Sequence, residues 1–216
     1  MEAGSLEKLC KERRSIRKWS SQEVPEALVL KAIELGTWAP SGGGNQPYHF
    51  YVVANPSKIS ALAQAVQQST DFIASLPAAQ DDAAAVLKWQ KNAAFFATAP
   101  VLIGVTASTY QSLADKILSA SLDDPEAVKI MAARKVASSR VQSAAAAINQ
   151  TLLALHTFGL GAVWMTGPVQ AKKEIEKILG VPEKEDFVAL IPVGYPAESP
   201  GVPEHKAQDA LVTILR

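Results

Sequence analysis

Two uninterrupted apolar segments constrain the fold of this chain more than any other feature of its sequence. Residues 101–105 and 187–193 carry no charged or polar side chain, and both segments are rich in β-branched residues. Side chains of a strand point alternately to its two sides, so a strand without polar positions has to be covered on both. We therefore expect two buried strands, with helices packed against the sheet that contains them.

Helical periodicity and turn residues place the remaining elements around these strands. Pro25 suits the first turn of a helix, and Gly36, Gly159 and Gly180 mark helix ends. Further strands are expected at 48–54, 162–165 and 210–215, and helices at 5–13, 25–35, 57–68, 81–97, 172–179 and 123–158, the last either continuous or broken near 135–138. The alanine-rich part of that helix, 143–155, allows a second helix to approach closely. Four or five strands among longer helices predict a layered α+β or α/β domain.

Composition excludes several classes of protein. Lys and Arg number 21, as do Asp and Glu, so the net charge is zero and the chain is not expected to bind nucleic acid. A single cysteine, Cys10, permits neither an intramolecular disulfide nor a thiolate zinc site, which fits a cytoplasmic protein. No secretory signal is expected at the beginning of the sequence. The most apolar stretch, about 13 residues long, is too short to span a membrane.

Basic residues are nevertheless concentrated in one segment. Residues 8–18 hold six of the 21 cationic side chains, and Glu12 alone offsets them. A solvated helix face is the ordinary explanation of such a run. A second explanation is that the chain enters the core within this segment. It is favoured by Ser15, which lies between the arginines, and by the apolar Ile16 and Trp19 that follow. Arginines beside a buried edge suit a phosphate or another dianion, which they bind through bidentate, charge-assisted hydrogen bonds.

Familiar catalytic motifs are absent from the sequence. The glycines 159 and 161 follow a helix and precede a strand, the reverse of a dinucleotide site, and the three glycines 42–44 lack the lysine of a phosphate-binding P-loop. The three histidines are far apart in the sequence and lack carboxylates at metal-ligand spacing. We therefore expect no metal site and no catalytic side chain, so that a cofactor would carry any reaction.

Three segments remain, and together they resemble one family. They are the arginine segment RRSIR (13–17), the glycine loop APSGGGNQP (39–47) and the late turn GLGAVWMTG (159–167). In this order, over residues 6–216, they resemble the FMN-dependent nitroreductase family. The resemblance implies one domain over residues 1–216, a three-layer α/β/α fold with a central, mostly antiparallel sheet of four to five strands. It also implies variable lids at about 68–92 and 108–135.

The resemblance also implies which residues bind the cofactor. The expected FMN contacts are Arg13, Arg14, Ser15, Arg17, Pro40, Ser41, Gly42, Gly43, Asn45, Thr166, Gly167 and Lys206. The arginine segment would bind the phosphate, the ribityl chain and the pyrimidine edge, the loop would lie beside the ring, and Thr166 and Gly167 would lie near N5. Either Asn45 or Gly44 takes the place of the family's loop asparagine. Lys206 stands where the family usually has a phosphate-binding arginine.

The resemblance finally implies an activity and an assembly. Hydride would pass from NADH or NADPH through FMN N5 to a nitroaromatic, a quinone or a similar flat acceptor in a ping-pong reaction. Two alternatives stay open: a reductive dehalogenase or flavin-degrading enzyme of the same fold, and a flavin-binding protein without catalysis. A homodimer is implied, with each FMN between the subunits and the C-terminal tail crossing to the partner.

Overall fold

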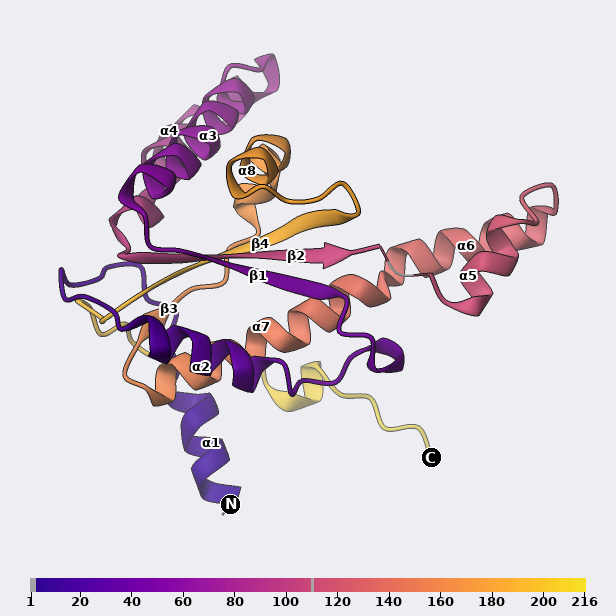
Figure 1. The fold of residues 1–216 in the computed structure, drawn as a ribbon, viewed down its shortest axis with the longest axis horizontal. Coiled ribbons are helices and arrows are strands. Elements are labelled where there is room, and N and C mark those ends of the chain that lie inside the picture. Colours follow the sequence, from indigo (N-terminus) through magenta and orange to yellow (C-terminus); the bar gives the residue numbers. More distant parts are fainter. Residues whose placement is uncertain (1–2, 110) are drawn as a thin grey trace.

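The computed structural model describes residues 3–109 and 111–216, and a four-stranded sheet forms its centre (Figure 1). The strands are β1 (Tyr48–Val53), β2 (Val101–Ser108), β3 (Gly161–Ala162) and β4 (Glu185–Gly194), in the order β1-β2-β4-β3. Every neighbouring pair is antiparallel. The expected fold class, a helix-rich α+β domain around a mostly antiparallel sheet, is confirmed.

Eight α-helices surround the sheet in the described residues. They are α1 (Ala3–Glu12), α2 (Glu26–Gly36), α3 (Pro56–Ala74), α4 (Ala83–Asn92), α5 (Leu113–Ser119), α6 (Pro125–Ala137), α7 (Ser139–Thr157) and α8 (Lys172–Leu179). The 3₁₀ turns are η1 (Gly42–Gly44), η2 (Pro77–Asp82), η3 (Phe95–Thr98), η4 (Gly167–Ala171) and η5 (Gln208–Ala210). Helices α2 and α7 lie on one face of the sheet and α3 and α8 on the other, while α5 and α6 project from the body as an arm (Figure 1).

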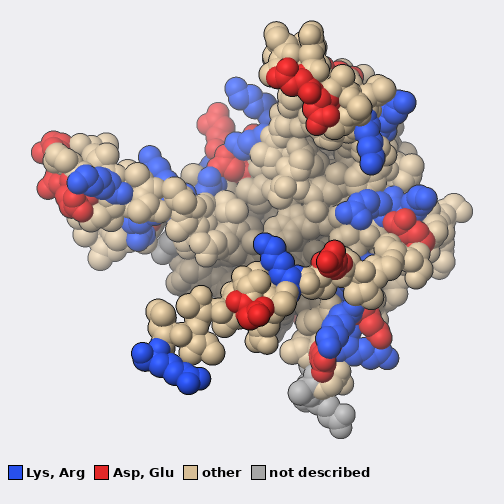
Figure 2. Space-filling view, turned by 180° about the vertical axis from the view of Figure 1, so that it is seen from behind, with Lys and Arg blue, Asp and Glu red and all other residues tan. Residues whose placement is uncertain are grey.

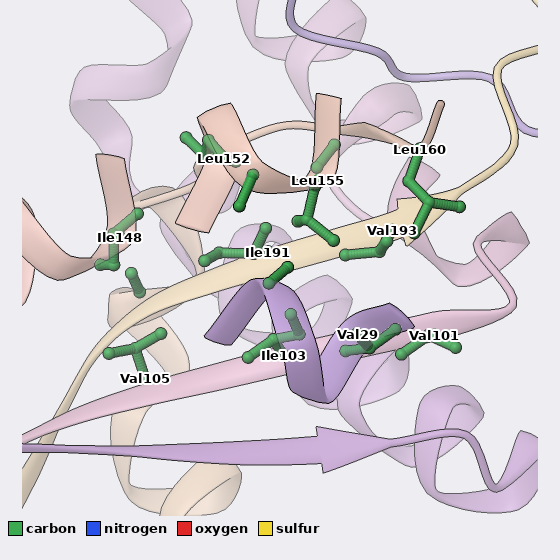
Figure 3. Packing of buried hydrophobic residues seen from close by; sticks show 14 of the residues in the cluster. Val29, Val101, Ile103, Val105, Ile148, Leu152, Leu155, Leu160, Ile191 and Val193 are labelled. Atoms are coloured by element: carbon green, nitrogen blue, oxygen red, sulfur yellow. The ribbon is translucent and has the colours of Figure 1, made fainter. Parts of the chain in front are cut away.

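The buried strands separate two hydrophobic cores, as their sequence predicts. Ile103 and Val105 of β2 point toward α2 and α7, where they pack with Val29 and Ile148 (Figure 3). Leu102, which alternates with them, points into the second core against α3 and α8. Both cores consist of apolar side chains withdrawn from water, and such burial is the main favourable term in folding. The sheet therefore forms a middle layer, and α7 packs along one face of it.

Helices α2 and α7 approach each other closely at Gly36. A β-carbon at this position would overlap the Thr151 hydroxyl and would lie 2.9 Å from the Ala147 carbonyl oxygen. Both α7 residues are fully buried or nearly so. The close approach expected for the alanine-rich helix is thus confirmed, with α2 as the helix that packs against it.

Several predicted boundaries are confirmed and others are wrong. Helix α3 continues to Ala74, beyond the predicted 57–68, and β3 is confined to Gly161–Ala162 instead of the predicted 162–165. The break expected near 135–138 occurs at Ser138, whose φ of 40° separates α6 from α7. The helix predicted at 81–97 is wrong in extent because α4 ends at Asn92 and a separate 3₁₀ turn carries the fully buried Phe96 into the second core. The strand predicted at 210–215 is also wrong. These residues reach no sheet edge, and every residue of 201–216 is exposed.

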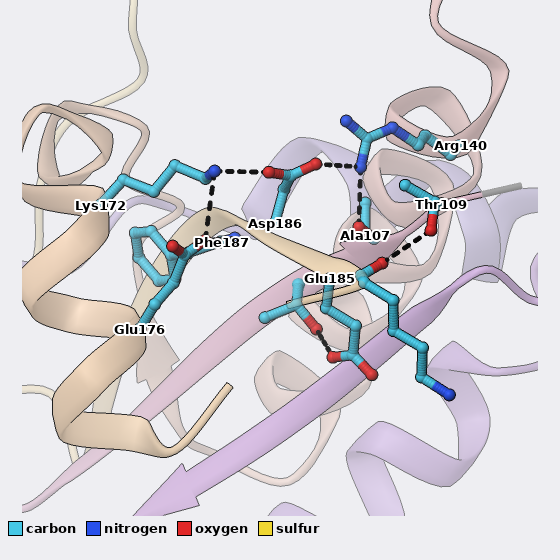
Figure 4. Close-up of polar contacts among 10 residues, drawn as sticks. Ala107, Thr109, Arg140, Lys172, Glu176, Glu185, Asp186 and Phe187 are labelled. Atoms are coloured by element: carbon cyan, nitrogen blue, oxygen red, sulfur yellow. Dashed lines mark hydrogen bonds and ion pairs between the residues drawn. The ribbon is translucent and has the colours of Figure 1, made fainter. Parts of the chain in front are cut away.

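A polar network fastens the beginning of α7 to the sheet (Figure 4). Asp186 of β4 forms ion pairs with Lys172 of α8 and with Arg140 of α7, whose Nη1 lies 2.5 Å from Asp186 Oδ2. The hydrogen bond from Lys172, followed by that from Arg140, lowers the pKa of Asp186. Arg140 Nη1 also donates to the carbonyl oxygen of Ala107 over 2.8 Å. The same arginine therefore holds α7 against both β2 and β4.

Candidate functional site

The arginine segment and the late turn are in direct contact. The Ile16 amide donates to the Ala162 carbonyl oxygen over 3.1 Å, and Ser15 pairs in parallel with Ala162. Gly161 has no space for a side chain, because a β-carbon there would lie 2.7–2.9 Å from three atoms of Ile16. Trp19 Nε1 donates to the Gly161 carbonyl oxygen over 2.9 Å. The first and third sequence motifs thus form one unit beside the end of α7.

A cavity of about 310 Å³ opens where these two motifs meet. Its lining combines charged side chains with apolar residues. The lining residues are Glu12, Arg13, Arg14, Ile16, Leu152, His156, Gly159, Leu160, Gly161, Ala162, Pro196, Glu198, Ser199 and Pro200. Burial lowers the pKa of His156, the last ionisable residue of α7, below its ordinary value. The positive charges of Arg13 and Arg14 act in the same direction, while Glu12 opposes them.

The two neighbouring arginines differ in what they bind. Arg14 is occupied by backbone: its Nη1 donates to the carbonyl oxygens of Lys11 and Arg13 over 2.5 and 2.8 Å, and its Nε donates to that of Gly201 over 3.2 Å. Arg14 therefore joins the end of α1 to the C-terminal tail. The Arg13 guanidinium forms no hydrogen bond or ion pair with the part of the chain that the structure describes. It is free to bind a ligand.

Glu198 is a member of this region that sequence reasoning missed. Its Oε1 accepts hydrogen bonds from the amides of Arg17 and Lys18, over 2.5 and 3.1 Å. Arg17 itself is exposed, and its Nη1 lies 3.4 Å from the Ser15 carbonyl oxygen. The carboxylate fixes the backbone that carries the arginines. No local pattern could have revealed it, because Glu198 stands 181 residues from Arg17 in the sequence.

The glycine loop lies at the other end of α7. The Gly42 amide donates to Ser143 Oγ over 3.1 Å, and a β-carbon at Gly42 would lie 2.7 Å from Ser139 Oγ. Gly43 has a φ of 62°, a conformation that glycine adopts without strain. Asn45 Nδ2 donates to the Gly42 carbonyl oxygen over 2.9 Å, so its side chain stabilises the loop itself. Ser41 does the same, since its Oγ accepts from the Gln46 amide.

The structure does not bring all three motifs to one place within a single chain. His156 lines the arginine cavity, whereas Ser143 binds the glycine loop. These residues are 13 positions apart in one helix, which corresponds to about 20 Å along its axis. Figure 1 shows the loop that follows α2 at one end of α7 and β3 at the other.

The remaining predicted residues are exposed. Met165 exchanges two backbone hydrogen bonds of 2.9 Å with Leu190, and Thr166 and Gly167 follow at the surface, where Gly167 begins η4. A β-carbon at Gly167 would have no neighbour within 4 Å. Pro40 is exposed beside the loop, and Lys206 is exposed in the C-terminal tail.

Charge is evenly distributed over the face of the molecule in Figure 2. Lysine and arginine are interspersed with aspartate and glutamate over the face in Figure 2, without a large region of one sign. Over the described ranges, 3–109 and 111–216, no three metal-ligating side chains come together. The helices in those ranges are too short or too polar to cross a membrane.

Comparisons with known proteins agree on one family. The model of the nitroreductase family matches residues 10–195. The chain is 30% identical to a Methanothermobacter thermautotrophicus protein named as an NADH dehydrogenase/NAD(P)H nitroreductase, covering 88% of this chain and 77% of that one. It is 28% identical to the iodotyrosine deiodinase of Haliscomenobacter hydrossis, over 94% and 84%. The crystal structure of a Desulfitobacterium hafniense nitroreductase with bound FMN superposes with a TM-score of 0.72 at 17% identity, over all of both chains.

Proposed function

Because this chain belongs to the nitroreductase family, we propose that it is an FMN-dependent oxidoreductase. It transfers hydride from NADH or NADPH through FMN N5 to a nitroaromatic, a quinone or a similar flat acceptor, in a ping-pong reaction. The observation that carries the proposal is the unit formed by the arginine segment and the late turn. This unit presents Arg13, which forms no ion pair with residues 3–109 or 111–216, beside the tightly packed Gly161.

The residues of this unit fit the chemistry of FMN. The phosphate of FMN is a dianion, and Arg13 and Lys206 supply cations without ion pairs among the described residues. Side chains alternate along an extended chain, so Ser15 and Arg17 leave the backbone on the side opposite the buried Ile16. A hydroxyl and a guanidinium on one side suit the ribityl chain and the pyrimidine edge of the ring. Arg14 serves this site by holding the tail rather than by binding the phosphate.

A second copy of the chain would complete the site. The glycine loop, with Pro40, Ser41, Gly42, Gly43 and Asn45, lies about 20 Å from the arginine cavity along α7, too far to contact the same ring from within one chain. A homodimer in which α7 packs near its counterpart would place the loop of one subunit beside the arginines of the other. The exposed tail supports this arrangement, because Leu211, Ile214 and Leu215 are 67, 70 and 91% exposed and have no apolar cover in one chain.

The residues of this chain would bind and orient rather than transfer protons. When bound, FMN supplies at N5 the atom that accepts and donates hydride. The amide of Gly167 begins a helix and has no partner within it, so it would donate toward N5. Arg17 would stabilise negative charge at the pyrimidine edge, where it develops on reduction. The acceleration of hydride transfer would come from holding the reacting atoms close together.

One alternative activity has specific support. The relationship to the Haliscomenobacter deiodinase covers 94% of this chain, against 88% for the Methanothermobacter relative. A reductive dehalogenase would use the same arginine unit and the same loop with a different acceptor. A flavin-binding protein without turnover would also keep both features, and only activity separates it from an enzyme.

A spectrum and a turnover measurement test the proposal. Purified protein should be yellow, should bleach on addition of NADH or NADPH, and should oxidise many equivalents of either in the presence of a quinone. Reduction of 3-iodotyrosine in preference to quinones and nitroaromatics would favour the dehalogenase. A colourless protein that FMN does not convert into an active one would refute the proposal. Light scattering after gel filtration should give twice the mass of the 23.0 kDa chain.

A further inference from the structure

A second cavity, of about 530 Å³, lies between the α5–α6 arm and the beginning of α7. Its size is in the range of small-molecule sites. Met131 and Ala137 give it apolar surface, whereas Gln111, Ser119 and Gln142 give it hydrogen-bonding groups. An aromatic ring with a polar substituent is the kind of molecule that such a mixed lining suits.

The cavity borders the glycine loop. Ser138 and Ser139 belong to its lining. Ser139 Oγ is also the atom that fills the space beside Gly42, and Ser143, one turn further along α7, binds the Gly42 amide. The proposed function places this loop beside the flavin ring. The cavity is therefore adjacent to the place where an acceptor would bind.

Two of the three cations in the lining are already neutralised. Arg134 Nε pairs with Asp115 at 2.6 Å, and its Nη2 donates to Ser112 Oγ over 2.8 Å. The hydrogen bond from Arg134 to Asp115, followed by those from Ser112, holds the pKa of Asp115 well below its usual range, so the carboxylate stays charged. Arg140 pairs with Asp186, as described above.

The third cation, Lys135, is different. It belongs to the last turn of α6, it is exposed, and it forms no ion pair within the ranges 3–109 and 111–216. Lys129 of the same helix, by contrast, pairs with Glu126 and does not line the cavity. Lys135 thus leaves one positive charge uncompensated at the wall of a cavity that otherwise offers an apolar surface and neutral polar groups.

We propose that this cavity is the acceptor site and that Lys135 selects acceptors with an anionic substituent, such as a carboxylate on an aromatic ring. The inference rests on the proposed function, since it names the substrate class of the same flavin. The ammonium group would pair with the substituent while Met131 contacts the ring. Lys135 is a specificity-determining residue here and takes no part in hydride transfer.

Two acceptors of nearly equal shape test the proposal: 4-nitrobenzoate, which is anionic, and 4-nitrobenzamide, which is neutral. The FMN-loaded enzyme would be assayed as wild type, Lys135→Gln, Lys135→Arg and, as a matched control on α6, Lys129→Gln. The ratio of kcat/KM for the anionic to that for the neutral acceptor should fall about fivefold in Lys135→Gln, the size expected of an ion pair near the surface. Lys135→Arg and Lys129→Gln should keep the wild-type ratio.

The outcomes separate this inference from the proposed function. No turnover by the wild type with either acceptor would contradict the proposed function itself. Normal turnover of 4-nitrobenzamide with an unchanged ratio in Lys135→Gln would overturn the inference alone. An altered KM for NADH or NADPH, with the acceptor ratio unchanged, would also overturn it, because the lysine would then bind a phosphate of the donor.

Discussion

The two ends of α7 are built by different means. At the end near His156, the backbone of Gly161 packs against the Ile16 side chain and leaves no room for a β-carbon. At the other end, the Ser143 hydroxyl accepts a hydrogen bond from the Gly42 amide and the Ser139 hydroxyl fills the space beside Gly42, while residues 43–46 of the loop are exposed. Cations gather at the first end, and the loop at the second carries none. Under the proposed function, the first end would bind the FMN phosphate and the loop at the second end would lie beside the flavin ring.

The close contact of Gly161 with Ile16 gives the largest expected effect at the two ends of α7. Gly161→Val should destabilise the fold by about 3 kcal/mol, because the added methyl groups would force Ile16 and the paired strand apart. Chemical denaturation measures the change. Gly167→Val is the matched control, since the surroundings of Gly167 are open and its substitution should cost less than about 1 kcal/mol. Equal effects at the two glycines would contradict the close packing described for the arginine end.

Loss of a cation at this end should weaken FMN binding rather than the stability of the fold. Arg13→Ala removes a charge-assisted hydrogen bond, so FMN affinity should fall by about 1.5–3 kcal/mol, or roughly 10- to 100-fold. Fluorescence titration of the apoprotein with FMN measures this change in affinity. Lys88→Ala, on the exposed surface of α4, should leave the affinity unchanged. Unaltered FMN affinity in Arg13→Ala would show that the phosphate lies elsewhere.

A change in the glycine loop should affect backbone conformation first. Gly43→Val places a β-branched residue at a φ of 62°, which should cost about 1–2 kcal/mol and displace the loop. Weaker FMN binding with little loss of global stability is expected, since the loop is exposed. Gly43→Asn is the control, because asparagine tolerates this conformation better. If the Gly43→Val and Gly43→Asn variants bound FMN equally well, the loop would not contact the ring.

The smallest expected effect concerns pH at the arginine end. Burial lowers the pKa of His156, so the folded protein favours the neutral imidazole more than the unfolded chain does. The stability that neutral His156 contributes is complete above the unfolded pKa of 6.5, and it is lost as pH falls through that value toward the folded pKa.

His156→Gln should therefore reduce the loss of stability on acidification from about pH 7.5 to about pH 5.5. Arg13→Ala should raise the pKa of His156 in an NMR titration, because Arg13 contributes to lowering it. An unchanged or lower pKa would mean that the guanidinium is too far from the ring to act on it.

Local signals in the sequence were sufficient for most of the elements. Gly180 ends α8 with a φ of 72°, and the apolar run at 101–105 is a strand covered on both faces, as predicted. Helix α5 was not foreseen. It has only seven residues and depends on a capping box between Ser112 and Asp115. Asp115 in turn pairs with Arg134 of α6, a contact that exists only after the arm has folded.

The candidate site was predictable as a set of residues, not as an arrangement. The arginine segment and the late turn could be expected to meet, and their contact is confirmed by the bridge between Ser15 and Ala162. The FMN contacts assigned to these residues stay predictions. Glu198 and Ser143 could not be recognised, because a carboxylate or a hydroxyl that binds a distant amide leaves no local pattern.

The sequence by itself determined where strands are buried and, at Gly36, Gly159 and Gly180, where helices stop, since both follow from the side chains of neighbouring residues. Only the tertiary structure decided which motifs share a surface. The reason is geometric. Helix α7 is a rigid rod of 19 residues, and its length separates the glycine loop from the arginines that the sequence predicts to bind the same FMN.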